Sequence, residues 1–547
     1  MRAPSPARRL EEVAAALGLD PAAALQPGRK PDPQAGLRIT GVCLDSRAIR
    51  PGDLYAALPG QRTHGARFVS AAAERGAVAV LTDPAGVELA EAAGLPVLAV
   101  DDPRAALGPL AAWLFGEPAR QMLMLAVTGT NGKTTTTFLM DGALRRGGGR
   151  RCGLVGTVET RIVDRRLPSV RTTPEAPDLQ ALLALMVAER ADACSMEVSS
   201  HALALGRVDG IQFDVAGFTN LSQDHLDFHA TMAEYFAAKA ELFTPARARV
   251  GVVCVDDEWG RRLADIATIP IVTIATRLGT GPADWRVSEP RPDGIGTSFT
   301  LRGPNGAVVA ARCPLPGDFN VANTALALVM LVAAGITAEA AADWLAVADP
   351  VPGRMEQIIG TQAAGEPLAI VDYAHTPDAV EAALRTLRGT RPGRLVVVLG
   401  AGGDRDRAKR PLMGQAAARE ADVVIVTDDN PRSEDPAAIR AAVLAGAGSS
   451  GSSGLKVIEV ADRRAAVLEG IRQAWDGGTL LVAGKGHESG QEIAGVVHPF
   501  DDRDVVRQAL HEFAALSRPD GPDRPGRQPV GRPAGQTEET EQTEADA

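Results

Sequence analysis

Short apolar runs separated by longer mixed segments cover most of the chain, and they are clearest after residue 350. The runs there are rich in β-branched residues and have the length of strands, at 368–371, 395–399, 423–426, 457–460 and 480–483. The segments between them are rich in alanine and arginine, which predicts helices. Strands that alternate with helices predict a parallel, doubly wound sheet, in which ligands bind beyond the carboxyl ends of the strands.

Two further α/β regions are expected before that sheet. The first is predicted to hold strands at 42–44, 54–58, 77–81 and 97–100, and helices at 7–17, 68–75 and 103–114. The second begins with an apolar strand at 122–127 and includes a strongly apolar helix at 322–334. We therefore expect an α/β protein with domains at 1–115, 116–350 and 351–517. Residues 518–547 have almost no apolar side chains, which predicts a disordered tail.

Composition narrows the class of protein. A hydrophobic content of 45% is enough for buried cores, and a net charge of −11 argues against nucleic acid as a partner, because a basic surface is missing. Five scattered cysteines form no CxxC motif, which indicates reduced thiols in a cytoplasm. No run reaches the roughly 18 apolar residues of a membrane span, and the N-terminus lacks the apolar core of a signal peptide. We expect a monomeric, cytoplasmic protein that does not insert into a membrane.

The apolar strand at 122–127 leads into TGTNGKT at 128–134, which has the composition of a phosphate-binding loop. Glycines let backbone N–H groups approach phosphates, and the helix expected at 135–144 adds a partial positive charge. Lys133 would reach the β- and γ-phosphates, and the Thr134 hydroxyl would coordinate magnesium. The match to GxxxxGK[ST] is incomplete, because Val127 stands where the first glycine is expected. A tight strand-to-helix turn with a chance Lys-Thr pair is the alternative.

Carboxylates and imidazoles follow in the same region. Glu197 stands in MEVSSH, His225 in DHLD and Lys239 in YFAAK. Near a phosphate loop, such groups suit magnesium and a transferred phosphoryl group. Taken one at a time, each is more typical of a surface or helix-capping side chain.

Together and in this order, the loop and these segments resemble the Mur ligase family over about residues 38–516. The resemblance implies a small N-terminal α/β domain for a uridine nucleotide, a central P-loop-type domain with a mostly parallel sheet, and a C-terminal Rossmann-like domain. It also implies an ATP-dependent amide ligase of cytoplasmic peptidoglycan precursor synthesis. Such an enzyme extends UDP-N-acetylmuramoyl-L-alanyl-D-glutamate by one amino acid through an acyl phosphate.

The resemblance also implies residues for ATP, catalysis and Mg²⁺. The ATP contacts of the family fall on Gly129, Thr130, Asn131, Gly132, Lys133, Thr134, Thr135, Asn320, Asn323, Arg354, Asp372 and His375. Its catalytic residues fall on Lys133, Glu197, His225 and Lys239, and its Mg²⁺ ligands on Thr134, Glu197, His225 and Lys239. The lysine is carbamylated in the family (N6-carboxylysine), which turns a cation into an anion. Asn320 is equally suited to cap the helix that follows it.

The contacts of the family with the UDP-sugar dipeptide fall on Ser46, Thr172, Thr173, Ser199 and Arg207. The Thr-Thr-Pro segment is also typical of a strand that ends before a proline turn. Residues 61–65 depart from the family pattern, in which an aspartate precedes the glycine, so the uridine contacts there stay open.

The DNPR segment at 429–432 resembles the signature of family members that add meso-2,6-diaminopimelate. Arg432 can pair bidentately with the distal carboxylate of that amino acid, which lysine lacks. The family contacts with it fall on Arg405, Asp429, Asn430, Arg432, Gly484 and Glu488. An Asn-Pro turn after a strand explains the same backbone without a ligand.

Three other functions are compatible with parts of this pattern. A folylpolyglutamate synthetase shares the phosphate loop but lacks the uridine-type domain and the DNPR segment. An inactive nucleotide-binding scaffold is disfavoured because Lys133, Glu197, His225 and Lys239 are all present. A simple P-loop ATPase would release ADP without both the UDP-sugar dipeptide and an amino acid.

Overall fold

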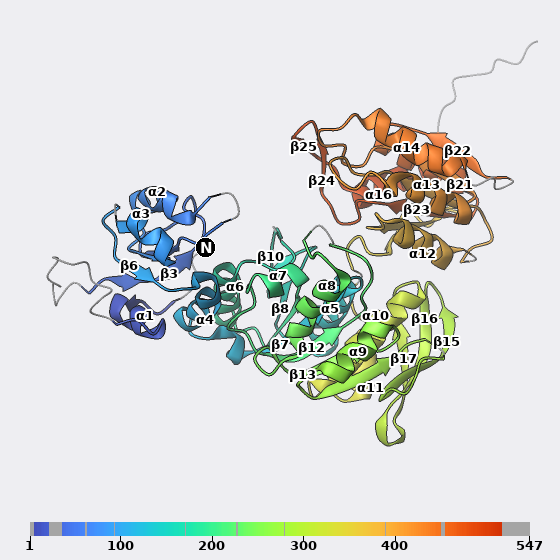
Figure 1. Cartoon of the computed structure of the whole chain (residues 1–547). Coiled ribbons are helices and arrows are strands. Elements are labelled where there is room, and N and C mark those ends of the chain that lie inside the picture. The colour runs from blue at the N-terminus through green and yellow to red at the C-terminus, as the bar shows by residue number, and fades with distance from the viewer. Residues whose placement is uncertain are drawn as a thin grey trace, which may run out of the picture.

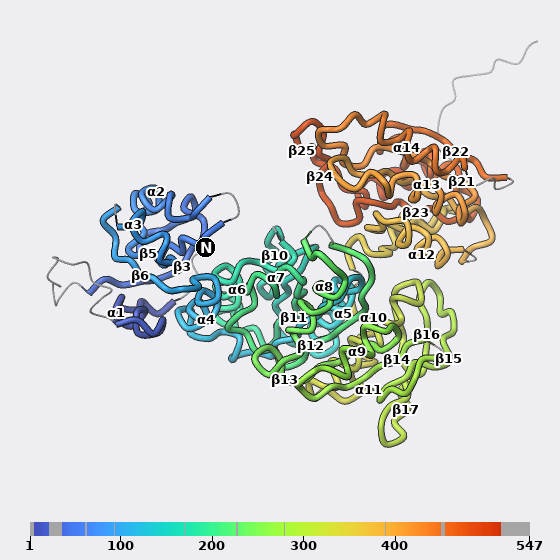
Figure 2. Tube along the Cα trace, viewed as in Figure 1, coloured from blue at the N-terminus to red at the C-terminus, as the bar shows by residue number. Residues whose placement is uncertain are grey.

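The computed structural model describes residues 5–20, 36–60, 63–91, 93–169, 171–225, 228–277, 279–349, 351–388, 390–449 and 454–516. The tail predicted at 518–547 lies outside the described residues. Figure 1 shows an N-terminal and a C-terminal α/β body at opposite ends of a central one, and Figure 2 shows that each is built from one continuous stretch of chain. All five cysteines are free thiols. Within the described part of the chain, no helix is both long enough and apolar enough to cross a membrane.

The N-terminal body is a small parallel sheet with helices. Its strands lie in the order β3 (Gly41–Cys43), β4 (Asp53–Ala56), β5 (Ala79–Thr82) and β6 (Val97–Ala99), which confirms the four predicted strands. Its helices are α2 (Val69–Glu74), α3 (Val87–Glu91), which was not predicted, and α4 (Pro103–Leu114). The helix predicted at 7–17 is wrong at its start, because Arg8 and Arg9 form β1 (Arg8–Arg9), which pairs with β2 (Arg38–Ile39). The shorter helix α1 (Leu10–Ala16) follows.

The central body is organised around an eleven-stranded sheet. Its strands lie in the order β10 (Arg165–Leu167), β9 (Thr160–Ile162), β8 (Cys152–Val155), β11 (Ala193–Glu197), β7 (Leu123–Thr128), β12 (Phe213–Phe218), β13 (Ala248–Cys254), β14 (Ile271–Ala275), β15 (Trp285–Asp293), β16 (Gly296–Arg302) and β17 (Val308–Cys313). In this spatial order, each strand from β8 through β15 pairs in parallel with the next. At the two edges, β9 and β10 on one side and β16 and β17 on the other pair antiparallel. The mostly parallel sheet predicted from the resemblance is therefore confirmed.

Helices cover both faces of the central sheet. One face packs against α5 (Lys133–Gly142), α10 (Asp318–Ala333) and α11 (Ala338–Ala346). The other packs against α6 (Ala176–Ala188), α7 (Ser200–Ala204), α8 (Met232–Ala240) and α9 (Glu258–Ile266). Helix α10 is apolar all round because it is enclosed by α5, α11 and the sheet. Helix α4 packs against α6, so the N-terminal body is attached through apolar side chains.

The C-terminal body is a doubly wound sheet, as predicted. Its strands lie in the order β18 (Glu356–Ile358), β19 (Leu368–Asp372), β23 (Thr479–Ala483), β20 (Leu395–Leu399), β21 (Val423–Val426) and β22 (Lys456–Glu459). Only β18, which was not predicted, is antiparallel among them. One face holds α12 (Pro377–Leu387), α13 (Lys409–Glu420) and α14 (Pro436–Gly448), and the other holds α15 (Arg463–Ala474) and α16 (Asp502–Leu516). The hairpin of β24 (Gly490–Ile493) and β25 (Val496–Pro499) precedes α16.

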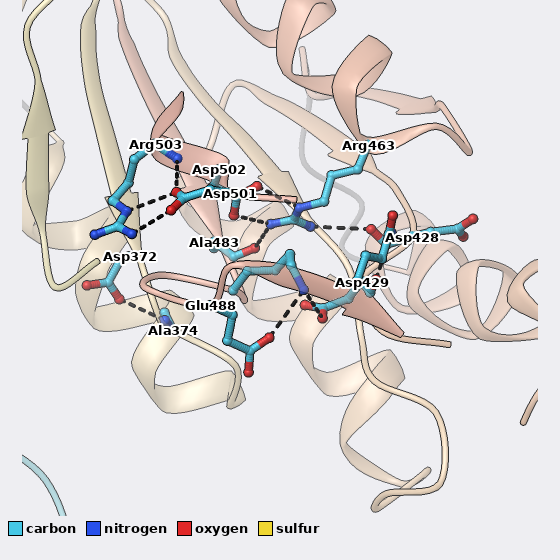
Figure 3. Close-up of polar contacts among 12 residues, drawn as sticks. Asp372, Ala374, Asp428, Asp429, Arg463, Ala483, Glu488, Asp501, Asp502 and Arg503 are labelled. Carbon is cyan, nitrogen blue, oxygen red and sulfur yellow. Dashed lines mark hydrogen bonds and ion pairs between the residues drawn. The ribbon is translucent and has the colours of Figure 1, made fainter. Parts of the chain in front are cut away.

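A buried ion pair holds the carboxyl end of the C-terminal sheet together. Arg463 Nε and Nη2 donate to the two carboxylate oxygens of Asp502 at 2.8 and 2.7 Å, and both side chains are 0% exposed. Nη2 also donates to the Ala483 carbonyl at 3.0 Å. Figure 3 shows Arg463 directed at Asp502 and at the backbone of Asp428. The pair thus ties the starts of α15 and α16 to the end of β23.

Replacing Arg463 with methionine is expected to destabilise this domain strongly. The Asp502 carboxylate would stay buried without its partner, which costs about 3–5 kcal/mol. Hydrogen exchange of peptides from residues 463–516 measures the effect. The control is Arg464→Met on the same helix, because its side chain is 42% exposed and its pair with Glu512 is worth less than about 1 kcal/mol. Equal exchange rates in the two variants would contradict the role of the buried pair.

Candidate active site

The phosphate loop connects β7 to α5, and its two glycines are required by the backbone. Gly129 has a φ of 142° and Gly132 a φ of 88°. A Cβ atom on Gly129 would collide with Oγ1 of Thr219, and one on Gly132 with Oδ1 of Asn323. Asn220 braces the loop, since its carbonyl and side-chain oxygens accept from the N–H groups of residues 130 and 131 at 2.9 and 3.1 Å. The first N–H groups of α5 are left for an anion, as at any helix start.

Lys133 lies folded over this loop. Its Nζ donates to the carbonyl oxygens of Gly129 at 2.9 Å and Thr130 at 2.8 Å. Burial lowers the pKa of Lys133, although the charges of Glu197 and Asp224 act in the opposite direction. In this arrangement, the ammonium group bonds to the carbonyl oxygens of the loop. A bound phosphate would replace these carbonyls as its partner.

Thr134 and Glu197 have the geometry of two neighbouring magnesium ligands. Thr134 Oγ1 donates to Glu197 Oε2 at 3.0 Å, and both residues are buried. In an octahedral shell with bonds of about 2.0–2.1 Å, adjacent oxygens lie about 2.9 Å apart. The described residues contain no group of three or more His, Cys, Asp or Glu side chains that could hold a metal ion. The two ligands therefore fit magnesium completed by phosphate oxygens and water, rather than an all-protein cage.

Thr157 is a site residue that the sequence analysis missed. Its N–H donates to Glu197 Oε1 at 2.7 Å, and its hydroxyl donates to Oε2 at 3.1 Å. These bonds orient the Glu197 carboxylate toward Thr134. The only local signal is the Gly156-Thr157 pair directly after β8, whose end lies beside the end of β11.

Lys239 and His225 both lie near the ring of Tyr235. Lys239 comes from α8, is 1% exposed, and donates to the Gly129 carbonyl at 2.8 Å, with Nζ 4.6 Å from the Tyr235 ring centre. Burial and then the positive charge of Lys133 hold the pKa of Lys239 well below its usual value. His225 has a φ of 53° and a ring centre 6.1 Å from that of Tyr235. A lowered pKa increases the fraction of neutral amine, which is the form that reacts with carbon dioxide.

The predicted substrate residues of the central body form one network with Glu197. Thr173 Oγ1 donates to the Glu197 carbonyl at 2.8 Å and accepts from the N–H of Ser199 at 3.2 Å. Arg207 Nη1 donates to the Thr173 carbonyl at 3.3 Å. Thr172 shares a hydrogen bond of 2.9 Å with the hydroxyl of Thr157. A continuous set of hydrogen bonds therefore connects the Thr134–Glu197 pair to the segment at 171–174.

Ser46 lies apart from that network. It follows β3 in the N-terminal body, beside Tyr55. Helix α6, which starts at Ala176 just after Thr173, packs against β3. The charge of Asp45, next to Ser46, acts on Asp178 near the start of α6, so the loop of Ser46 and the start of α6 belong to the same contact between the two bodies. Of the segment at 61–65, Gln61 and Arg62 lie outside the described residues.

Asn320 and Asn323 lie beside the phosphate loop. Asn323 Nδ2 donates to Asn320 Oδ1 at 3.1 Å, and Asn320 Nδ2 donates to the Pro316 carbonyl at 2.8 Å. Helix α10 begins at Asp318 with Gly317 as its cap, so the alternative that Asn320 caps the helix is wrong. Both amides are buried and sit one turn apart on the helix that packs against α5.

Arg354, Asp372 and His375 lie near one another in the C-terminal body. The Arg354 guanidinium lies 4.5 Å from the ring centre of Tyr373. Its positive charge adds to the lowering of the pKa of Lys133. The Asp372 carboxylate accepts from the N–H groups of Met355 at 2.6 Å and Ala374 at 2.8 Å. Burial raises the pKa of Asp372, against the effect of Arg354. Burial also lowers the pKa of His375.

The residues predicted to hold an amino acid gather at the carboxyl ends of β20, β21 and β23. Asn430 Nδ2 donates to Glu488 Oε2 at 2.8 Å. Arg432 Nη1 donates to the Gly403 carbonyl at 2.7 Å, and Arg432 Nε lies 3.3 Å from Glu492 Oε2. Figure 3 shows Asp429 and Glu488 beside the Arg463 pair.

The backbone of this segment is held in unusual conformations. Arg432 has a φ of 52°, fixed by its hydrogen bonds to Glu492 and Ala494 in the hairpin at 3.0 and 2.7 Å. Gly484 has a φ of 117°, and a Cβ there would collide with the Asp429 carboxylate. Left-handed backbone at a non-glycine residue costs free energy and is common at binding sites. Arg405 is exposed and lies across Gly402 from Arg432.

Replacing Gly132 with alanine is expected to abolish nucleotide use. The added Cβ would displace Asn323 and strain a residue with a φ of 88°. A shift of about 1 Å in a reacting group costs about 100-fold in rate, so kcat/KM for ATP should fall at least that far. Phosphate release at varied ATP measures it. Gly448→Ala is the control, since its Cβ position is open. Unchanged ATP kinetics in Gly132→Ala would refute the role of the loop.

Three family models match the chain. They are the Mur ligase family catalytic domain at residues 38–113, the Mur ligase middle domain at 127–331, and the Mur ligase glutamate ligase domain at 353–486. Together they include the phosphate loop, Glu197, Lys239 and the DNPR segment.

Individual proteins agree with these models. The UDP-N-acetylmuramoyl-L-alanyl-D-glutamate–2,6-diaminopimelate ligase of Streptomyces coelicolor is 56% identical over 87% of this chain and 94% of its own length. The UDP-N-acetylmuramyl-tripeptide synthetase of Leifsonia xyli is 46% identical over 93% of this chain and 97% of its own. A solved structure of a UDP-N-acetylmuramoyl-L-alanyl-D-glutamate–2,6-diaminopimelate ligase superposes with a TM-score of 0.65 at 33% identity, covering 92% of this chain and 99% of the other. The chain therefore belongs to the Mur ligase family.

Proposed function

We propose that this chain is an ATP-dependent amide ligase that joins meso-2,6-diaminopimelate to UDP-N-acetylmuramoyl-L-alanyl-D-glutamate. The observation that carries the proposal is the loop at 429–432, where hydrogen bonds from Lys485 and to Glu488 hold Asn430, and bonds to Gly403 and the hairpin hold Arg432. The name of the Streptomyces coelicolor relative supports the same amino acid. The name of the Leifsonia xyli relative does not state which amino acid is added, so specificity needs its own test.

Each body has one task in this proposal. The region at 1–115 holds the uridine nucleotide, with Ser46 as a contact. The region at 116–350 holds ATP and the dipeptide end of the sugar substrate, and the region at 351–517 holds the amino acid. Because one chain carries all three regions, one copy can supply every group that the reaction needs, and we propose that the enzyme is a monomer. The substrates ATP and a nucleotide sugar place the enzyme in the cytoplasm.

The reaction begins at the phosphate loop. The D-glutamate side-chain carboxylate attacks the γ-phosphorus of ATP, and the bond from that phosphorus to the β-phosphate oxygen breaks. ADP departs, and the carboxylate has become an acyl phosphate. Lys133 and the N–H groups at the start of α5 stabilise the charge on the transferred group. Magnesium held by Thr134 and Glu197, and by His225 with a carbamylated Lys239, would supply further charge compensation. Thr172, Thr173, Ser199 and Arg207 orient the dipeptide.

The second half of the reaction uses the amino acid. A neutral amine of diaminopimelate attacks the acyl carbon, phosphate leaves, and the amine loses a proton as the amide forms. Arg432 binds the distal carboxylate with its remaining guanidinium hydrogens, and Arg405 lies on the same side. The C-terminal body must bring this amine to the acyl phosphate, and the charge of Arg354, which acts on Lys133, supports an approach of that body to the phosphate loop.

An amino-acid panel tests the proposal directly. With ATP and the UDP-sugar dipeptide, phosphate release should require meso-diaminopimelate and be far slower with lysine. The Arg432→Ala variant should raise KM for diaminopimelate by about 10- to 100-fold, the loss of one to two charged hydrogen bonds. Arg472→Ala, an exposed residue of α15 paired with Glu469, is the control. Product with lysine alone would overturn the proposed specificity.

Carbamylation of Lys239 is testable by carbon-13 NMR. Labelled bicarbonate should give a carbamate resonance in the wild type that is absent from Lys239→Ala and retained in Lys456→Ala. Because only the neutral amine reacts, and the pKa of Lys239 is depressed, the signal should be present at neutral pH and fall as the pH is lowered. A spectrum identical in the wild type and Lys239→Ala would contradict the carbamate.

A further inference from the structure

Lys485 is a fully buried cation among the residues predicted to hold the amino acid, and it is not one of those residues itself. It follows β23 and is 0% exposed. Its Nζ donates to Asn430 Oδ1 at 2.9 Å and to Glu488 Oε2 at 3.2 Å, and it lies 4.0 Å from Asp429 Oδ1. A buried ammonium is costly unless it is paired and hydrogen-bonded, and these three partners all belong to the predicted binding set.

The position of Lys485 decides how the Asn430 amide is oriented. Asn430 Oδ1 accepts from Lys485 and also from the N–H of Glu492 at 3.0 Å. An ammonium group and a backbone N–H can only donate, so the amide oxygen must face them. The amide nitrogen then faces Glu488, to which it donates at 2.8 Å. A flipped amide would set N–H groups against two donors and its oxygen against a carboxylate.

This orientation leaves a defined pattern of unused groups. Among the described residues, Asn430 Nδ2 donates only to Glu488, which leaves its second hydrogen for a ligand. The Glu488 carboxylate receives Lys485 and Asn430 through Oε2, which leaves Oε1 to accept. Arg432 stands two residues from Asn430 along the same loop. Donors for a carboxylate therefore lie next to an acceptor for an ammonium group.

We propose that Lys485 is a positioning residue for amino-acid specificity, which locks Asn430 as a donor and Glu488 as an acceptor toward the distal amino-acid group of the substrate. That group carries one carboxylate and one ammonium, and it matches this donor and acceptor pattern. Lysine supplies only the ammonium. The inference rests on the proposed function, because it concerns how the same site distinguishes its amino acid.

The nearby Arg463 does not perform this task. Its guanidinium is satisfied by Asp502 and two backbone carbonyls, and it makes no hydrogen bond to Asn430 or Glu488 among the described residues. Of these two cations, Lys485 is the one that bonds to Asn430 and Glu488. Arg463 stabilises the sheet through Asp502, and Lys485 orients the side chains of the site.

Steady-state kinetics of Lys485→Met test the proposal. Methionine removes the charge and the donors at similar length, so KM for diaminopimelate should rise about 10- to 100-fold. KM for ATP and for the UDP-sugar dipeptide should change less than about twofold, because Lys485 contacts neither site. The preference for diaminopimelate over lysine, as a ratio of kcat/KM, should fall. Lys456→Met, an exposed lysine of β22, is the control and should match the wild type.

A double variant separates orientation from general stability. If Lys485 acts through Asn430, the rise in KM of Lys485→Met combined with Asn430→Ala should be well below the product of the single effects. Multiplying effects, an unchanged KM for diaminopimelate, or equal rises in all three KM values would each overturn the proposal. Lys485→Gln keeps a donor for Asn430 without the charge, so its KM should lie between wild type and Lys485→Met. If Lys485→Met does not fold, a wild-type KM in Lys485→Gln overturns the proposal and a raised one supports it.

The amino-acid panel is measured first with the wild type. A failure of the proposed function can then be distinguished from a failure of the proposed role of Lys485. A wild type that ligates a different amino acid refutes the proposed function. The same KM comparison, made with that amino acid, then decides the role of Lys485. Calorimetric titration of diaminopimelate into wild type and Lys485→Met gives the comparison without turnover, and equal affinities would overturn the inference.

Discussion

The carboxylate of Glu197 is the point on which the central site depends. It is buried at the end of β11, and its two oxygens receive hydrogen bonds from Thr134 and from the backbone and side chain of Thr157. Its own carbonyl holds Thr173. One residue thus connects the phosphate loop, the Thr134–Glu197 pair and the segment at 171–174. A buried carboxylate needs such partners, because an unpaired one would be strongly destabilising.

The parallel sheets explain why these groups meet. Strands β8, β11, β7 and β12 end at the same edge, so Thr157, Glu197 and the phosphate loop come together although they are far apart in sequence. The C-terminal sheet repeats the arrangement with β20, β21 and β23. There the buried charges do two different things. The Arg463–Asp502 pair connects the starts of α15 and α16, and Lys485 bonds to Asn430 and Glu488 of the predicted amino-acid site.

Much of the fold was predictable because its signals are local. The β-branched runs of the C-terminal sheet and the apolar run of β7 have strand length, and they are strands. The errors also have local causes. Residues 8–9 were assigned to a helix, but they pair with β2 across a gap of about thirty residues that no local pattern encodes. The helix that starts at Asp318 was placed four residues too late, because the polar Asp318 and Asn320 interrupt the apolar pattern of its first turn. Strand β18 pairs antiparallel with β19, and its few residues carry little pattern.

The sequence by itself determined the order of the motifs, the phosphate loop with its glycines, and the DNPR segment, because each depends on residues next to one another. The tertiary structure alone decided which distant groups complete them. Thr157 reaches Glu197 across 40 positions and Lys485 reaches Asn430 across 55. A single threonine or a single lysine does not reveal its distant partner from its residue type. Only the sheet, by bringing strand ends to one edge and burying them, turns these two side chains into parts of a site.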